Sequence, residues 1–163
     1  DGDAHLEGIE ATLTFMGDDG DVTVMGGEFP LCRLELEDGD IRVADGKGSF
    51  EIAVDDGDVS LSRVTAEIVD VRGDDGDVDL DLLMANKLHV NVSLDDGDSI
   101  LRLARGLSFE YLVTMDDGGV SVDLEGVTNP ETSEHRVSGV VGGGGGLVRV
   151  STGDGDVTLI SGS

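Results

Sequence analysis

The chain has 163 residues, which is enough for one domain with its own core, and we treat residues 1–163 as a single unit. Its formal net charge of −26 excludes nucleic acid as a partner, because phosphate binding needs a basic surface, and no apolar run is long enough for direct membrane insertion. Apolar residues make up 38% of the chain and aromatic residues only 3%, so the core has to be built from Val, Leu and Ile, which favours strands.

An Asp-Gly turn recurs along the chain. Successive turn glycines are 18 to 21 residues apart, except that Gly118 and Gly155 are separated by 37 residues. We interpret this longer interval as two coils whose middle marker has been lost or covered by an insertion. The turn glycines are, in chain order, Gly2, Gly20, Gly39, Gly57, Gly76, Gly97, Gly118 and Gly155.

Apolar residues alternate with polar residues on both sides of each turn, which is the pattern of half-buried strands. After the turns the pattern places Ala4 and Leu6, Val22 and Val24, Ile41 and Val43, Val59 and Leu61, Val78 and Leu80, Ser99 and Leu101, Val120 and Val122, and Val157 and Leu159. Before the turns it places Leu13 and Phe15, Leu34, Phe50 and Ile52, Val69 and Val71, Val90 and Val92, Tyr111 and Val113, and Val148 and Val150. Each repeat therefore contains two short strands, joined by the Asp-Gly turn and by a second, more variable turn.

Two strands with one apolar face cannot bury that face alone, but stacked coils can. The sequence therefore predicts an all-β, single-stranded β-solenoid, or β-helix, of about eight coils of roughly 19 residues, stacked about 4.8 Å apart. An Asp-Gly flanked by alternating apolar residues is also a strong hairpin signal, so an antiparallel meander or barrel is the alternative. The solenoid is favoured because identical residues recur at the same place in every repeat.

Two stretches carry a resemblance to a known family. Residues 78–97 contain one full repeat, and residues 135–159 contain a run of five glycines followed by the last Gly-Asp-Val marker. They resemble the bacterial and archaeal adhesin-like domains of unknown function, which are related to the auto-transporter adhesin head domains. The resemblance covers nearly the whole chain. It implies a β-helix, usually on an exported or membrane-anchored protein, with no established catalysis.

Acidic residues flank almost every turn glycine, and in a solenoid they would form files along one edge. Carboxylates about 5 Å apart repel each other by about 1–3 kcal/mol, and bridging Ca²⁺ ions would relieve this repulsion because they take six to eight oxygen ligands. The other interpretation, and the one we favour, is a solvated acidic edge whose Asp residues make ordinary turn hydrogen bonds. The candidate calcium ligands are Asp19, Asp21, Asp38, Asp40, Asp56, Asp58, Asp75, Asp77, Asp96 and Asp98.

The sequence contains little that predicts catalysis. His5, His89 and His135 are scattered, and Cys32 has no histidine at a recognisable spacing, so we expect a surface role for the histidines and a bystander thiol. The glycines of residues 142–146 lack the Lys and Ser or Thr of a phosphate-binding loop, so we interpret them as a turn or bulge. Residues 125–136 lack apolar alternation and predict a surface loop, where a partner contact is one option.

Three functions follow from these observations. The favoured one is a non-enzymatic, adhesin-like binding or scaffolding module, exported to the cell surface or the extracellular space, that holds a protein or glycan and whose acidic edge is a candidate Ca²⁺ site. The second is an extracellular filament subunit whose copies stack end to end, because the repeat stands both at Asp1 to Asp3 and at Asp154 to Asp156, with no capping helix. The third is an acidic-site hydrolase, disfavoured because the Asp residues lie in exposed turns.

Overall fold

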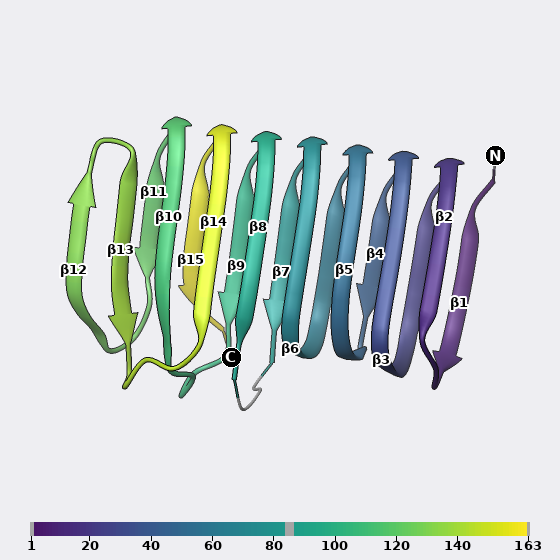
Figure 1. Cartoon of the computed structure of the whole chain (residues 1–163), viewed down its shortest axis with the longest axis horizontal. Helices are drawn as coiled ribbons and strands as arrows, with labels where there is room; N and C mark the ends of the chain where they lie inside the picture. The colour runs from purple at the N-terminus through teal and green to yellow at the C-terminus, as the bar shows by residue number, and fades with distance from the viewer. Residues whose placement is uncertain (1, 84–86, 163) are drawn as a thin grey trace.

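The computed structural model describes residues 2–83 and 87–162, so Asp1 of the first repeat lies outside the described residues. The described residues form a 15-stranded sheet that winds into a tube (Figure 1). They contain no helix that is long and apolar enough to cross a membrane. The strands are β1 (Ala4–Ile9), β2 (Leu13–Asp19), β3 (Val22–Asp38), β4 (Ile41–Ala44), β5 (Lys47–Asp56), β6 (Val59–Asp75), β7 (Val78–Leu82), β8 (His89–Asp96), β9 (Ser99–Leu103), β10 (Phe109–Asp117), β11 (Val120–Asp123), β12 (Val127–Ser133), β13 (Arg136–Val141), β14 (Leu147–Asp154) and β15 (Val157–Ser161).

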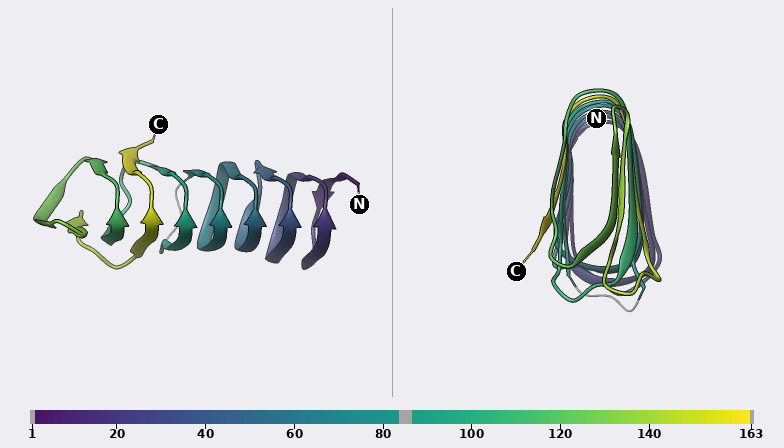
Figure 2. Two further views of the ribbon diagram at one scale, coloured as in Figure 1. Left: turned by 90° about the horizontal axis from the view of Figure 1, so that it is seen from above. Right: turned by 90° about the vertical axis from the view of Figure 1, so that its left-hand side faces the viewer.

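The strands form two facing walls of a flattened tube, which the end-on view in Figure 2 shows. Wall A holds the strands that follow an Asp-Gly turn, and wall B holds those that precede one, while β3 and β6 run through both walls. The Asp-Gly turns form one edge of the tube, which we call the Asp-Gly edge, and the other turns form the opposite edge. Neighbouring coils pair in parallel and in register, as where Val22 pairs with Ile41 and Ile41 with Val59. The solenoid is therefore confirmed, and the meander or barrel is excluded.

The core lies between the two walls and is mostly aliphatic. The alternating positions expected from the sequence are buried in the middle coils, for example Leu61, Leu80 and Leu101. Two of the few aromatic residues, Phe29 and Phe50, pack edge to face with ring centroids 5.9 Å apart. Because each coil repeats the same pattern, a residue is covered by its equivalents in the coils on either side as well as by the facing wall.

One buried position in wall A carries a polar residue. Ser99 is fully buried between Val78 and Val157, and its hydroxyl has no hydrogen-bond partner among the described residues. We expect Ser99→Val to raise the free energy of unfolding by about 1–2 kcal/mol, because it removes an unsatisfied group and extends an apolar column. Urea unfolding measures this change. Ser121→Val, at an exposed position of β11, is the control and should change little; a loss of stability in Ser99→Val would contradict the expectation.

The coils do not stack in the order of the sequence. The coil of β14 and β15 lies between the coil of β8 and β9 and the coil of β10 and β11, so that the yellow β14 stands between β8 and β10 in Figure 1. The turn glycines accordingly stack so that Gly155 lies against Gly97, and Gly118 lies against Gly155. The interpretation of the 37-residue interval as two coils with a lost marker is therefore wrong. After β11 the interval holds a hairpin and then β14, with no further Asp-Gly turn. We call the coil of β14 and β15 the displaced coil.

A hairpin closes the end of the tube beyond β10. β13 pairs antiparallel with β10, and β12 pairs antiparallel with β13, so wall B continues two strands past the last strand of wall A, β11. The expectation of a loop over residues 125–136 is wrong, because β12 and the start of β13 occupy most of it. Its residues show no apolar alternation because β12 faces no opposite wall, and nearly all of the strand is exposed. We call this hairpin, together with the adjoining residues 104–108, 124–126 and 142–146, the capped end.

The hairpin also bears on the expectation that copies stack end to end through open coils, because this end of the tube is covered by β12 and β13. β12 contains Pro130, which has no N–H to donate, Asn129 with φ 50°, and a register shift between Thr128 and Glu131. Such features discourage pairing of an edge strand with another chain. End-to-end stacking of copies stays a prediction, but it would not join two identical coils.

Candidate functional site

The Asp residues that follow the turn glycines form a hydrogen-bonded ladder along the Asp-Gly edge. In each coil, the carboxylate Oδ1 accepts the backbone N–H of the equivalent residue in the next coil, at distances of 2.8–3.2 Å. The last acceptor, Asp156, takes the N–H of Gly119. We define the Asp ladder as Asp3, Asp21, Asp40, Asp58, Asp77, Asp98 and Asp156.

The ladder gives each carboxylate a structural partner. A backbone N–H that donates to one carboxylate oxygen offsets part of the repulsion between neighbouring carboxylates. The bond also gives an acceptor to a backbone N–H that the turn would otherwise leave without one. Five of the ten candidate calcium ligands belong to this ladder: Asp21, Asp40, Asp58, Asp77 and Asp98.

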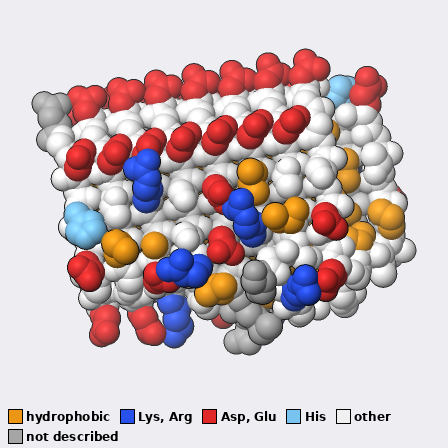
Figure 3. Space-filling view, turned by 180° about the vertical axis from the view of Figure 1, so that it is seen from behind, with side chains coloured by type: hydrophobic (Ala, Val, Ile, Leu, Met, Phe, Trp, Pro, Cys, Tyr) orange, Lys and Arg blue, Asp and Glu red, His pale blue; other side chains and the backbone are white. Residues whose placement is uncertain are grey.

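The other five candidate ligands precede the turn glycines and are exposed. They lie in register from coil to coil, and the backbone carbonyls of Asp38, Asp56, Asp75 and Asp96 accept the glycine N–H of the preceding coil, as where Gly57 donates to Asp75 at 3.0 Å. Within residues 2–83 and 87–162, the structure brings together no group of three or more His, Cys, Asp or Glu side chains that could hold a metal ion. Figure 3 shows two of the acidic files as parallel rows along the Asp-Gly edge. Calcium binding stays a prediction.

The effects of two salts on the melting temperature distinguish calcium binding from screening of the carboxylate charges. If Ca²⁺ bridges these carboxylates, millimolar CaCl₂ should raise the melting temperature far more than NaCl of equal ionic strength, because a bound ion stabilises the folded state by mass action. Replacing both Asp56 and Asp75 with Asn should reduce the calcium effect while leaving the ladder intact. Equal shifts by the two salts in differential scanning calorimetry would eliminate the metal.

Crowding of charge at the acidic edge affects Asp74. Desolvation raises the pKa of its carboxyl group, and the charges of nearby carboxylates add to the rise, namely those of Asp55, Asp95, Asp75 and Asp56. The folded state therefore binds this proton more tightly than the unfolded state. The contribution to stability is present below the ordinary carboxyl pKa of about 4 and is lost as the pH rises through the raised pKa.

Asp74→Asn tests this effect. We expect the substitution to raise the melting temperature at pH 7 and low salt, where the wild-type carboxylate is charged, and to change it little at pH 3, where that carboxylate is protonated. Asp123→Asn, in β11, is a control that removes the same charge elsewhere and should gain less. Thermal melts across pH 3–7 measure both variants; a gain for Asp74→Asn that does not depend on pH would contradict the assignment.

The remaining predicted residues lie apart from one another. His5, His89 and His135 are exposed, as expected for surface residues. Cys32 is fully buried in wall B, and desolvation raises the pKa of its thiol to about 12, so it is neutral at physiological pH and unsuited to nucleophilic attack.

A pocket of about 390 Å³ opens at the opposite edge of the capped end. The displaced coil has no turn at this edge, because β14 begins and β15 ends there. Residues 104–108 instead pass directly from β9 to β10, across two coil spacings. The pocket occupies the region where the missing turn of the displaced coil would lie. It is lined by residues 103–109, 124–126, 141–142 and 161.

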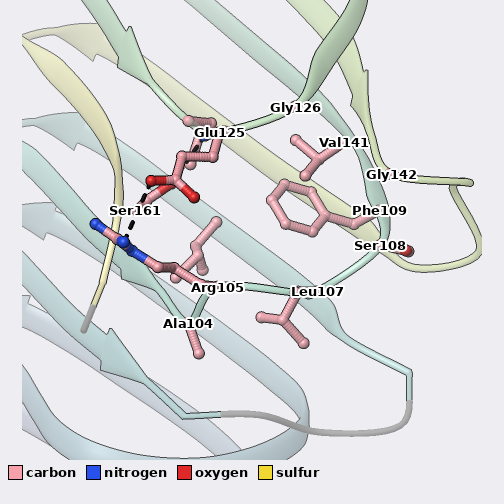
Figure 4. Close-up of a pocket in the computed structure, with 13 residues that line it drawn as sticks. Ala104, Arg105, Leu107, Ser108, Phe109, Glu125, Gly126, Val141, Gly142 and Ser161 are labelled. Atoms are coloured by element: carbon pink, nitrogen blue, oxygen red, sulfur yellow. Dashed lines mark hydrogen bonds and ion pairs between the residues drawn. The ribbon is translucent and has the colours of Figure 1, made fainter.

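The pocket combines an apolar floor with a polar rim (Figure 4). Leu107, Phe109 and Val141 form part of the floor and are largely buried. At the rim, the guanidinium of Arg105 lies 3.4 Å from the carboxylate of Glu125, whose backbone N–H donates to Ser161 Oγ at 2.9 Å. Both charged side chains are more than half exposed, so the ion pair is weak and can be exchanged for contacts to a ligand.

Sequence reasoning missed this pocket. Residues 104–108 look like any other variable turn, and the pocket depends on where a coil about 40 residues further along inserts. The usable signal was the longest interval between turns, which marks the break in the repeat, together with the glycine run that precedes the displaced coil.

The stacked turns, parallel register and two-walled core define a β-solenoid repeat protein. The chain belongs to the Toastrack DUF4097 family, whose profile matches residues 1–102 and, in a second match, residues 49–160. The overlap of the two matches agrees with a repeat whose coils are similar enough to align in more than one register. Neither the curated proteins nor the solved structures contain a match to the chain.

Proposed function

We propose that this protein is a non-enzymatic, adhesin-like binding or scaffolding module, at the cell surface or in the extracellular space, that holds a protein or glycan at its capped end. The observation that carries the proposal is that the regular repeat is interrupted at this end, where the exposed hairpin and the pocket lie next to each other. Glu125, Gly126 and Gly142, which flank the hairpin, and Val141, its last residue, all line the pocket.

The hairpin offers polar groups on a rigid support. Asn129, Glu131 and Thr132 are exposed on β12, and β12 is held by β13, which pairs with β10 of the solenoid. Short amide, carboxylate and hydroxyl groups can hydrogen-bond to sugar hydroxyls or to a protein backbone. A support that does not reorganise on binding lowers the entropic cost of recognition.

The pocket adds a place for an anchoring group. Its apolar floor suits a small apolar side chain or sugar face, and the Arg105–Glu125 pair at the rim can pair with a charged or polar group beside it. Interfaces commonly concentrate their binding energy in a pocket of this kind, with polar contacts around it.

Paired substitutions at the capped end test the proposal. We expect Arg105→Ala with Glu125→Ala, and separately Glu131→Ala with Thr132→Ala, to reduce attachment at least about tenfold without lowering the melting temperature. Attachment is measured with beads coated with the purified protein, on intact cells of the source organism and on a glycan array.

A matched control lies at the other end of the rod. Lys47 and Glu28 form an ion pair at 2.9 Å with side chains 61% and 67% exposed, close to the 63% and 65% of Arg105 and Glu125. Lys47→Ala with Glu28→Ala should leave attachment unchanged. Attachment lost equally in the control, retained in both end variants, or absent from the unmodified protein would overturn the proposal.

A further inference from the structure

The displaced coil is held on both sides by strands that precede it in the sequence. Val150 of β14 pairs with Val92 of β8 and with Val113 of β10, and the same arrangement holds for β15 between β9 and β11. The Asp ladder continues through it, because Asp156 donates its N–H to Asp98 Oδ1 and accepts the N–H of Gly119, both at 2.8 Å. We call the space between these neighbouring coils the slot.

The slot is the main source of burial for this coil. Val148, Val150, Val157 and Leu159 are all fully buried, which a terminal coil covered on one side does not achieve. β10 and β11 precede β14 and β15 in the chain, so the last coil has to enter between two coils that stand two coil spacings apart in the folded structure. During folding, the slot is therefore open to any segment with this sequence.

A glycine segment connects the hairpin to the displaced coil. Residues 142–146 leave β13 at Val141, pass Ser108, which directly precedes β10, and enter β14 at Leu147 on the far side of β10. The two ends are separated by two strand spacings, about 10 Å. Five glycines span up to about 20 Å, so the segment goes around Ser108 without tension. Gly142, Gly144 and Gly145 all have positive φ. Glycine adopts positive and negative φ about equally readily, so the path of this segment can change at little cost.

We propose that the coil of β14 and β15 is an exchangeable element, and that in a second copy of this chain it occupies the equivalent slot to form a reciprocal, strand-swapped dimer. The contacts made in the slot are the same whether the coil comes from the same chain or from the partner, so only the path of residues 142–146 and the protein concentration decide between the two forms. Two copies joined in this way would carry two capped ends, which would raise the avidity of attachment to a surface.

Shortening the glycine segment should force the exchange. Deleting Gly143, Gly144 and Gly145 leaves three Cα–Cα steps, at most about 11 Å, which is too short to pass around Ser108 within one chain. We expect this variant to run as a dimer, with twice the mass of the chain, in size-exclusion chromatography with light scattering. Gly143→Ala keeps the length at a position where a Cβ meets nothing within 4 Å, and it should stay a monomer.

A disulfide experiment identifies the exchanged coil. One chain carries Asn91→Cys and the other Arg149→Cys, at positions that pair between β8 and β14. When both also carry the deletion and are refolded together, the swapped dimer brings the two thiols into register, and a disulfide joins the chains. Glu51→Cys mixed with Asp70→Cys is the control, because these positions pair between β5 and β6, which do not exchange.

The outcomes separate cleanly. A disulfide-linked dimer in the first mixture, with none in the control, supports the exchange. A folded monomer from the deletion variant, or equal linkage in both mixtures, overturns it. If the deletion variant does not fold, the same cysteine pair is refolded together at high concentration with the full glycine segment, and the absence of any linked dimer there also overturns the proposal.

Discussion

Gly57→Ala should be among the most damaging single substitutions in this protein. At the stacked turns each glycine lies directly on the backbone of the turn below, and a Cβ on Gly57 would lie 2.2 Å from the carbonyl oxygen of Gly39. The residue also has φ 148°, which side-chain-bearing residues rarely adopt. We expect a loss of at least about 3 kcal/mol in the free energy of unfolding, and a melting temperature about 6 to 12 °C lower.

Gly26→Ala separates the two causes of this loss. Gly26 also has a positive φ, of 65°, but a Cβ there would meet nothing within 4 Å. It should therefore lose only the roughly 1–2 kcal/mol that a left-handed conformation costs an ordinary residue. Urea unfolding of both variants measures the difference, and equal losses would show that stacking of the turns contributes nothing.

Phe50→Ala should produce a loss of about 3–5 kcal/mol. Phe50 is fully buried between the walls and packs against Phe29, so truncating it removes apolar burial and leaves a cavity. The rigid coils above and below limit how far the site can collapse. Chemical unfolding measures the loss, and the reduced burial should also appear as faster hydrogen exchange in the strands of the neighbouring coils.

Met16→Ala is the matched control for that loss. Met16 lies on the outer face of wall B and is 66% exposed, so its truncation should change stability by no more than about 0.5 kcal/mol. A similar loss in both variants would mean that the space between the walls is not the stabilising core.

The acidic edge shows how much of a candidate site can be predicted from residue patterns alone. The repeated Asp-Gly-Asp placed these carboxylates in files along one edge, and the structure confirms the files. The sequence pattern could not show which atoms these carboxylates contact, because hydrogen bonds within one turn and hydrogen bonds between coils use the same Asp residues. Only the stacked backbone shows that the carboxylate of Asp58 accepts the N–H of Asp77 from the next coil.

The sequence by itself determined the all-β class, the alternation that fills the core and the Asp-Gly turns, and it favoured parallel stacking over hairpins, because each depends on contacts between equivalent positions of a repeat. The tertiary structure decided the order of the last coils, and with it the capped end and the pocket. The physical reason is that the coils are nearly interchangeable: Val150 lies between Val92 and Val113, and because the three residues are of one type, the local pattern cannot specify which of them are neighbours. The path of the chain through residues 104–108 and 142–146 makes that choice.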